Sequence, residues 1–228
     1  MKQLALDIGL QTTPSLDSFF AGPNAAALQH LKLWTSGQTP SPVPTYLWGE
    51  SGSGKTHLLK GVFQVLKDQG LSVGWLDAST EAYLSFDASW VAVLMDDVHL
   101  FNLEQQAMGF NWFVNALTPK SGLPRWVLAA GTLPPADLKL RDDFRSRLGW
   151  GHVFALQVLS DNERRAVLRQ EADSRGLFLS DEVVSYMLTR FSRDLSSLMT
   201  LLNHLDQFAL QTQRAITIPL IKSMLENT

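Results

Sequence analysis

The sequence of 228 residues predicts a parallel α/β fold followed by a small helical domain. Two observations support this prediction. Five short apolar runs alternate with helical stretches up to about residue 156, and this alternation is typical of a parallel sheet with helical crossovers. After residue 160 the apolar runs stop and only helical patterns continue, so a domain boundary is expected near residue 159.

The α/β domain is expected to cover residues 15–159, after an extended tail of residues 1–14. A helix is predicted over Ala25–Trp34, and the Pro- and Ser-rich residues 36–44 predict a loop. The expected strands are the five apolar runs Tyr46–Trp48, Val73–Leu76, Val91–Met95, Trp126–Ala130 and Val153–Leu156.

Residues 160–228 are expected to form a helical lid domain. Ser160 followed by Glu163 predicts a helix that starts with a capping box, and Ser180 predicts the start of another. Pro219–Glu226 is the expected last helix. An apolar stripe at helical spacing is expected to be core; it consists of Leu195, Leu198, Met199, Leu202, Leu205 and Ala209.

The segment Gly49–Thr56 matches the phosphate-binding loop pattern G-x-x-x-x-G-K-[ST], between an expected strand and an expected helix. Glycines allow successive backbone N–H groups to surround phosphate oxygens, and the helix N-terminus adds positive potential. Lys55 is expected to reach the β- and γ-phosphates, and the Thr56 hydroxyl to bind Mg²⁺. The expected nucleotide contacts here are Gly49, Ser51, Gly52, Ser53, Gly54, Lys55, Thr56 and the adjacent His57.

Two carboxylates follow the third apolar run. A buried strand that delivers an acid at its end is how P-loop proteins hold Mg²⁺, which predicts Asp96 as a metal ligand. Asp97 is predicted to orient an attacking water; the alternative is that the pair caps a turn. His57 and His99 make no metal-binding pair with useful spacing and are otherwise interpreted as local structure.

A short predicted helix before the fifth strand carries Arg145 and Arg147. Residues two positions apart on a helix point in different directions, so one side chain can be held internally while the other projects outward. Whichever of the two is exposed is a candidate arginine finger, which would reach the γ-phosphate of a neighbouring subunit. The alternative is a surface Arg–Asp ion pair.

Composition limits the function classes. The net charge of −3 argues against a dedicated nucleic-acid surface, and the absence of cysteine excludes disulfides and thiolate metal sites. The N-terminus lacks the pattern of a signal or transit peptide, and the apolar runs are shorter than a membrane span. A cytoplasmic protein without membrane contact is expected.

Together, the loop, Asp96-Asp97, the helical stretch 110–117 and Ser146-Arg147-Leu148-Gly149-Trp150-Gly151 resemble the AAA+ core of the DnaA replication initiators. The resemblance covers about residue 16 to the end. It implies bound ADP or ATP with Mg²⁺, adenine packing by the segment that contains Phe20 and Asn24, and a first-sensor position at Thr132.

A departure from the family pattern predicts weak intrinsic ATPase activity. The second-sensor Arg of the family aligns with Ser196, which cannot neutralise a γ-phosphate. Loss of that charge-assisted contact favours tolerance of, or preference for, ADP. Arg147 aligns with the arginine finger of the family, which acts in trans.

Both ends of the chain differ from full initiators, which have a long N-terminal region and a C-terminal helix-turn-helix domain. In this the chain resembles the regulatory family members that inactivate DnaA. This resemblance implies a negative regulator of replication initiation. It would bind a DNA-loaded sliding clamp, stimulate hydrolysis of DnaA-bound ATP and contact DNA only indirectly, through the clamp. The expected clamp-binding residues are Gln3, Leu4, Leu6 and Ile8; a homo-oligomer is possible.

Two other function classes stay open at this point. One is an ATP-driven helicase loader, which would bind helicase and single-stranded DNA; the clamp-like tail and the Gly149-Trp150-Gly151 motif argue against it. The other is a clamp-binding adaptor whose phosphate loop is only structural. Intact Lys55, Thr56 and Asp96 argue against that alternative.

Overall fold

The computed structural model describes residues 14–37, 43–81, 84–120, 122–191 and 195–226. Residue contacts divide the chain into two compact units, Thr12–Val158 and a unit that contains Leu159–Thr228. The first is called the α/β unit below and the second the lid unit. Each is described by itself.

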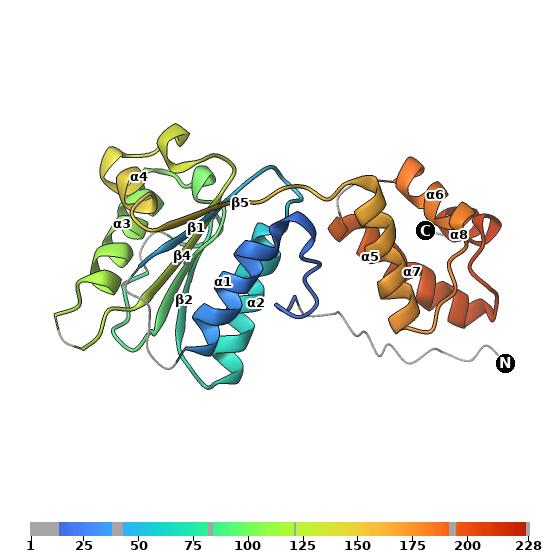
Figure 1. Cartoon of the computed structure of the whole chain (residues 1–228), viewed down its shortest axis with the longest axis horizontal. Helices are drawn as coiled ribbons and strands as arrows, with labels where there is room; N and C mark the ends of the chain where they lie inside the picture. The colour runs from blue at the N-terminus through green and yellow to red at the C-terminus, as the bar shows by residue number, and fades with distance from the viewer. Residues whose placement is uncertain (1–13, 38–42, 82–83, 121, 192–194, 227–228) are drawn as a thin grey trace. The chain divides into compact units, whose positions relative to one another are not determined.

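The α/β unit is built on a parallel sheet of five strands, which confirms the predicted fold class. The strands lie in the order β2-β3-β4-β1-β5 (Figure 1). Their bounds are β1 Thr45–Trp48, β2 Val73–Leu76, β3 Ala92–Met95, β4 Trp126–Gly131 and β5 His152–Ala155.

Helices cover both faces of this sheet. α1 (Ala25–Ser36), preceded by the short η1 (Gly22–Asn24), and α2 (Lys55–Asp68) lie on one face, while α3 (Leu103–Leu117) and α4 (Asp142–Leu148) lie on the other (Figure 1). Successive side chains of a strand point to opposite faces. Leu94 accordingly packs in the α1–α2 core and Val93 in the α3–α4 core.

Because all strands are parallel, their carboxyl ends share one edge of the sheet. The phosphate loop follows β1 there, Asp96 follows β3, and Thr132 follows β4. β1 lies between β4 and β5, where the strand order reverses, and such switch points are where open α/β sheets bind ligands. Two 3-10 turns follow these strands, η2 (Val98–Leu100) and η3 (Pro135–Asp137).

The lid unit contains four helices among its described residues: α5 (Asp161–Ser174), α6 (Asp181–Arg190), α7 (Leu195–Thr212) and α8 (Ile218–Glu226). The predicted capping box is confirmed, because the Glu163 N–H donates to Ser160 Oγ and the Ser160 N–H donates to Glu163 Oε2. The predicted apolar stripe supplies core, with Leu198, Leu202 and Leu205 fully buried.

Several element bounds differ from the sequence prediction at polar residues. α1 continues past Trp34 to Ser36, and β1 and β5 begin at Thr45 and His152. These two polar residues are paired in register across the strands, and both contact His30 of α1. A search for apolar runs misses polar strand residues of this kind, because their side chains contact a residue that is far away in the sequence. No helix among the described residues has the length and apolar character needed to cross a bilayer.

Candidate functional site

The glycines of the phosphate loop are required by its backbone path. Gly54 has φ +95°, and a Cβ at this position would lie 2.6 Å from Cε2 of Phe19. Gly49 has φ +154°, and its Cβ would lie 2.3 Å from the carbonyl oxygen of Leu156. Side chains are therefore excluded at both positions, as the motif predicts.

The loop leads directly into α2, whose N-terminus is well suited to an anion. Gly54 is the N-cap residue and makes no side-chain capping bond, and the first turn contains no acidic residue. The first backbone N–H groups of a helix have no partner within the helix, and the helix dipole favours negative charge there. A phosphate group fits both the free donors and the field.

Lys55 lies buried within the loop, with 5% of its surface exposed. Its ammonium group donates hydrogen bonds to the carbonyl oxygens of Gly49 (2.8 Å) and Glu50 (2.9 Å). Burial lowers the Lys55 pKa, and the nearby charges of Asp97 and Asp96 oppose this shift. The loop thus holds a desolvated cation whose charge a bound phosphate would stabilise.

Asp96 is likewise buried, at the end of β3. Its carboxylate accepts hydrogen bonds from the Thr56 side chain and, at 3.1 Å, from the Asp97 N–H. Burial raises the Asp96 pKa, with Asp97 adding to the shift and the hydrogen bonds opposing it. A bound cation would lower the Asp96 pKa again, since it favours the ionised carboxylate.

Asp97 adopts the left-handed backbone conformation, with φ 48° and ψ 46°. This conformation is uncommon for a non-glycine residue, although Asp tolerates it better than most. The side chain is 40% exposed, and its Oδ1 atom lies 3.9 Å from Nδ1 of His99. Asp97 is therefore more accessible than Asp96, as a residue that orients water requires.

The residues present fit a Mg²⁺–nucleotide. A buried ammonium, uncapped helix N–H groups and glycine backbone suit the phosphates. The Thr56 hydroxyl and the Asp96 carboxylate lie within hydrogen-bond distance of one another and offer the oxygen ligands that Mg²⁺ prefers. Among the described residues, no cluster of three or more His, Cys, Asp and Glu side chains suggests a metal site elsewhere.

The expected adenine contacts are less direct. The buried Asn24 side chain donates to the Gln157 carbonyl (2.9 Å) and accepts from the Gln157 N–H (2.8 Å), so its amide ties α1 to the chain after β5. Phe20 is half-buried nearby in sequence, and Thr132 is half-buried after β4. Their contacts with a nucleotide stay predictions.

Phe19 belongs to the segment expected to pack against adenine, but the sequence did not indicate that its ring contacts the phosphate loop. Its ring lies against Gly54 and at 5.5 Å, centroid to centroid, from the ring of His57. His57 itself bonds the carbonyl oxygen of Ser15 at 2.9 Å through Nε2. A pattern of neighbouring aromatics, Phe19-Phe20, was visible in the sequence, but it does not tell which ring meets the loop.

The two arginines of α4 contact different partners, and neither is buried. Arg145 forms an ion pair with Asp142 at 2.7 Å. The Arg147 guanidinium instead lies 4.0 Å from the ring centroid of Trp150 and 5.7 Å from that of Phe110. Trp150 is 59% exposed. Within the described residues, Arg147 forms no ion pair, so its charge is presented on an aromatic surface.

Trp150 is the second residue that sequence reasoning missed. The residue was part of the motif, but its role as a platform for Arg147 depends on the turn after α4, where the Trp150 N–H donates to the Arg147 carbonyl (3.1 Å). The expected clamp-binding residues Gln3, Leu4, Leu6 and Ile8 lie outside the described residues, as does the side chain of Ser196.

Comparisons with known proteins agree with this geometry. Residues 161–225 match the family model described as the lid domain of Hda. An uncharacterized protein of Haemophilus influenzae is 33% identical over 98% of each chain. The crystal structure of domain III of the Thermotoga maritima replication initiation protein DnaA superimposes with a TM-score of 0.73 at 19% identity, covering 93% of this chain and 95% of that one.

Two further structures are similar in fold. The AMPPCP-bound DnaA of Aquifex aeolicus has a TM-score of 0.69 at 22% identity, over 87% of this chain and 66% of that one. A RuvB mutant from Thermotoga maritima has a TM-score of 0.65 at 16% identity, over 94% and 72% of the respective chains. The chain belongs to the DnaA-like AAA+ family and is related to Hda.

Proposed function

We propose that this DnaA-related replication regulator inactivates DnaA by supplying Arg147 to the ATP that DnaA binds. In this mechanism its own phosphate loop holds an adenine nucleotide, ADP or ATP, with Mg²⁺. The bound nucleotide sets the shape of the α/β unit, and the hydrolysis that matters takes place in the site of the partner.

The environment of Arg147 is the observation that carries the proposal. The guanidinium lies on Trp150, and the next residue, Gly151, packs against Pro44, which precedes β1. The phosphate loop follows the other end of β1. Arg147 is therefore connected to the amino-terminal edge of the sheet, whereas the nucleotide site lies at the carboxyl-terminal edge. This arrangement suits a finger that acts on a neighbouring protein.

The chemistry of such a finger is electrostatic. Negative charge on the transferred phosphoryl group is stabilised by a guanidinium that reaches it from outside the site. Stacking on Trp150 restricts the side chain without neutralising it, because an aromatic ring attracts the cation through its face. An ion pair such as that of Arg145 would compete with the phosphate instead.

The nucleotide of this chain has a supporting role. The Aquifex aeolicus DnaA structure contains AMPPCP, and an adenine nucleotide suits the loop described here. Lys55 would contact the phosphates, Thr56 and Asp96 would hold Mg²⁺, and Asp97 would orient water. Because Ser196 aligns with the second-sensor Arg, we propose that turnover at this site is slow.

Recruitment is proposed to use the N-terminal tail. Gln3, Leu4, Leu6 and Ile8 match the kind of short peptide that docks on the sliding clamp, in which apolar side chains enter pockets and a Gln supplies directional hydrogen bonds. Docking on a DNA-loaded clamp would bring the protein close to DNA without direct contact with the bases. We expect this to take place in the cytoplasm.

The proposal is tested by measuring hydrolysis of DnaA-bound ATP with this protein, nucleotide and Mg²⁺, in the presence and absence of clamp loaded on DNA. Stimulation is expected only with the loaded clamp. Replacing Gln3→Ala together with Leu6→Ala is expected to abolish both clamp pull-down and stimulation. Equal stimulation without clamp, or by the double variant, would contradict clamp-dependent recruitment.

A further inference from the structure

A short segment of the chain packs along one side of the helix that starts at the phosphate loop. Gly54, His57 and Gly61 are spaced three and four residues apart, which places them on one side of α2. All three contact residues 15–19, called the strap below. The contact extends from the N-cap of α2 through its second turn.

His57 supplies the polar contact of this face. Its Nε2 atom lies 2.9 Å from the Ser15 carbonyl oxygen and 3.4 Å from Ser18 Oγ. The side chain is half-buried, and its ring lies beside that of Phe19. With Nε2 carrying the proton, the imidazole donates to Ser15 and holds the strap against the first turn of α2.

The two glycines allow the strap to lie flush on the helix. A Cβ on Gly61 would be 2.9 Å from the Leu16 backbone nitrogen and 3.1 Å from the Ser15 carbonyl carbon. Leu16 is 4% exposed and belongs to the α1–α2 core. At the other end, the Phe19 ring occupies the space that a Gly54 side chain would need. Neither contact is possible with a larger residue.

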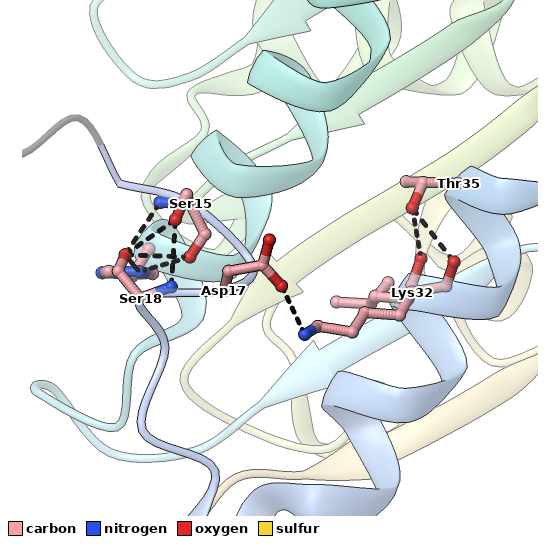
Figure 2. A network of polar contacts seen from close by, with 7 residues as sticks. Ser15, Asp17, Ser18, Lys32 and Thr35 are labelled. Atoms are coloured by element: carbon pink, nitrogen blue, oxygen red, sulfur yellow. Dashed lines mark hydrogen bonds and ion pairs between the residues drawn. The ribbon is translucent and has the colours of Figure 1, made fainter.

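The strap is also organised internally (Figure 2). The Ser18 N–H donates to Ser15 Oγ at 3.0 Å, and the Ser15 N–H donates to Ser18 Oγ at 3.2 Å. Asp17 forms an ion pair with Lys32 of α1 at 2.6 Å, with side chains 91% and 44% exposed. The serine bonds form a compact turn that presents the Ser15 carbonyl to His57, while the exposed ion pair contributes little.

We propose that the strap and His57 form a clasp on the phosphate loop and control how long a nucleotide stays bound there. The inference rests on the proposed binding of adenine nucleotide at this loop. Opening of the loop for release requires Gly54 and the first turn of α2 to move, and this movement breaks the His57–Ser15 bond and displaces the Phe19 ring. His57 is thus a positioning residue that acts through the loop.

Release of a fluorescent ADP analogue, followed by stopped flow after mixing with excess ADP, tests the clasp in the full-length protein. His57→Leu removes the N–H group that bonds the Ser15 carbonyl and keeps a side chain of similar size. Gly61→Ala displaces the strap two turns along α2, away from the phosphate loop. His57→Leu is expected to release the analogue about fivefold faster, the factor that loss of one net hydrogen bond predicts. Gly61→Ala is also expected to accelerate release, because a Cβ there would lie 2.9 Å from the Leu16 backbone nitrogen and displace the strap. His57→Gln retains an N–H donor and is expected to restore slow release.

Lys32→Gln is the matched control, because it breaks the exposed ion pair of the strap and leaves the α2 contacts intact. Its release rate is expected to equal that of the wild type, and equal acceleration by Lys32→Gln would overturn the clasp. So would unchanged rates in both His57→Leu and Gly61→Ala, or failure of His57→Gln to restore slow release. A wild-type protein that binds no ADP would overturn the nucleotide part of the proposed function, and the clasp with it.

Discussion

Lys55 and Arg147 are both cations suited to phosphate, but the α/β unit holds them in opposite ways. Lys55 is 5% exposed, bonded to two carbonyl oxygens and close to two carboxylates. Arg147 lies on the exposed ring of Trp150, with no ion pair among the described residues. The buried cation belongs to the phosphate loop of this chain, whereas the stacked cation is the one that we propose acts on a nucleotide held by the partner.

This difference separates binding from stimulation. Substitutions at the loop are expected to change nucleotide affinity, and substitutions around Trp150 are expected to change only the effect on the partner. A change of nucleotide affinity caused by substitutions around Trp150 would break the comparison.

Arg147→Ala is expected to have the largest effect. Removal of an arginine finger costs about a thousandfold or more in the rate of phosphoryl transfer, so stimulated hydrolysis of DnaA-bound ATP should fall to the basal rate. Clamp binding and ADP affinity should stay unchanged. Arg147→Lys keeps the charge but loses the planar group that stacks on Trp150, and should recover little. Full stimulation by Arg147→Ala would exclude the trans mechanism.

Lys55→Met is expected to weaken ADP binding by roughly a hundredfold in calorimetric titration, because hydrogen bonds to charged groups contribute about 1.5–3 kcal/mol each. Methionine fills the buried space and removes the cation that lies near Asp96 and Asp97. The chosen control is Lys60→Met on the same helix, whose side chain is exposed. Equal loss in both variants would mean that the effect is not specific to the loop.

Trp150→Ala is expected to lower stimulation by about two- to fivefold, since a cation–π contact at an exposed site contributes about 0.5–1 kcal/mol. Trp150→Phe keeps an aromatic face and should lose less. ADP affinity is the internal control, because Gly151, next to Trp150, packs before the start of β1 and the phosphate loop follows its other end. Unchanged stimulation in Trp150→Ala would show that the platform does not orient Arg147.

The strands and the phosphate loop were predictable because their signals are local. An apolar run such as Val93–Met95 is buried on both faces of the sheet, and the glycines at 49 and 54 serve backbone conformations that the motif specifies. The family resemblance added the role of Arg147, which spacing alone left open between a finger and an ion pair.

The contacts that position the site were not predictable in the same way. Asn24 bonds Gln157 across 133 residues, and His57 bonds Ser15 across 42. Neither pair has a sequence pattern, since each depends on segments that meet only when the sheet is assembled. The strand ends at Thr45 and His152 were missed for the same reason, because His30 supplies their partner from α1.

Asp96→Asn tests the buried site through the stability of the protein. Burial raises the Asp96 pKa above 3.8, so between that value and the raised pKa the folded state binds more protons than the unfolded state. The free energy of unfolding then falls as the pH rises through this window. The cost of burying the ionised Asp96 carboxylate persists at neutral pH. Without Mg²⁺ and nucleotide, Asp96→Asn should therefore increase the free energy of unfolding at pH 7 by about 1 kcal/mol. The gain should vanish near pH 3.8.

With ADP and Mg²⁺ the wild type should be more stable than Asp96→Asn, because only the wild type gains stability from a metal held by the carboxylate. Thermal unfolding at both pH values, with and without the ligands, measures all four cases. Asp97→Asn is the matched control: its side chain is 40% exposed and Asn also tolerates the left-handed backbone, so its stability should change by less than about 0.5 kcal/mol. If Asp96→Asn destabilises the ligand-free protein, the hydrogen bonds from Thr56 and Asp97 stabilise the carboxylate by more than its burial costs. The buried Asp96 would then not destabilise the empty nucleotide site.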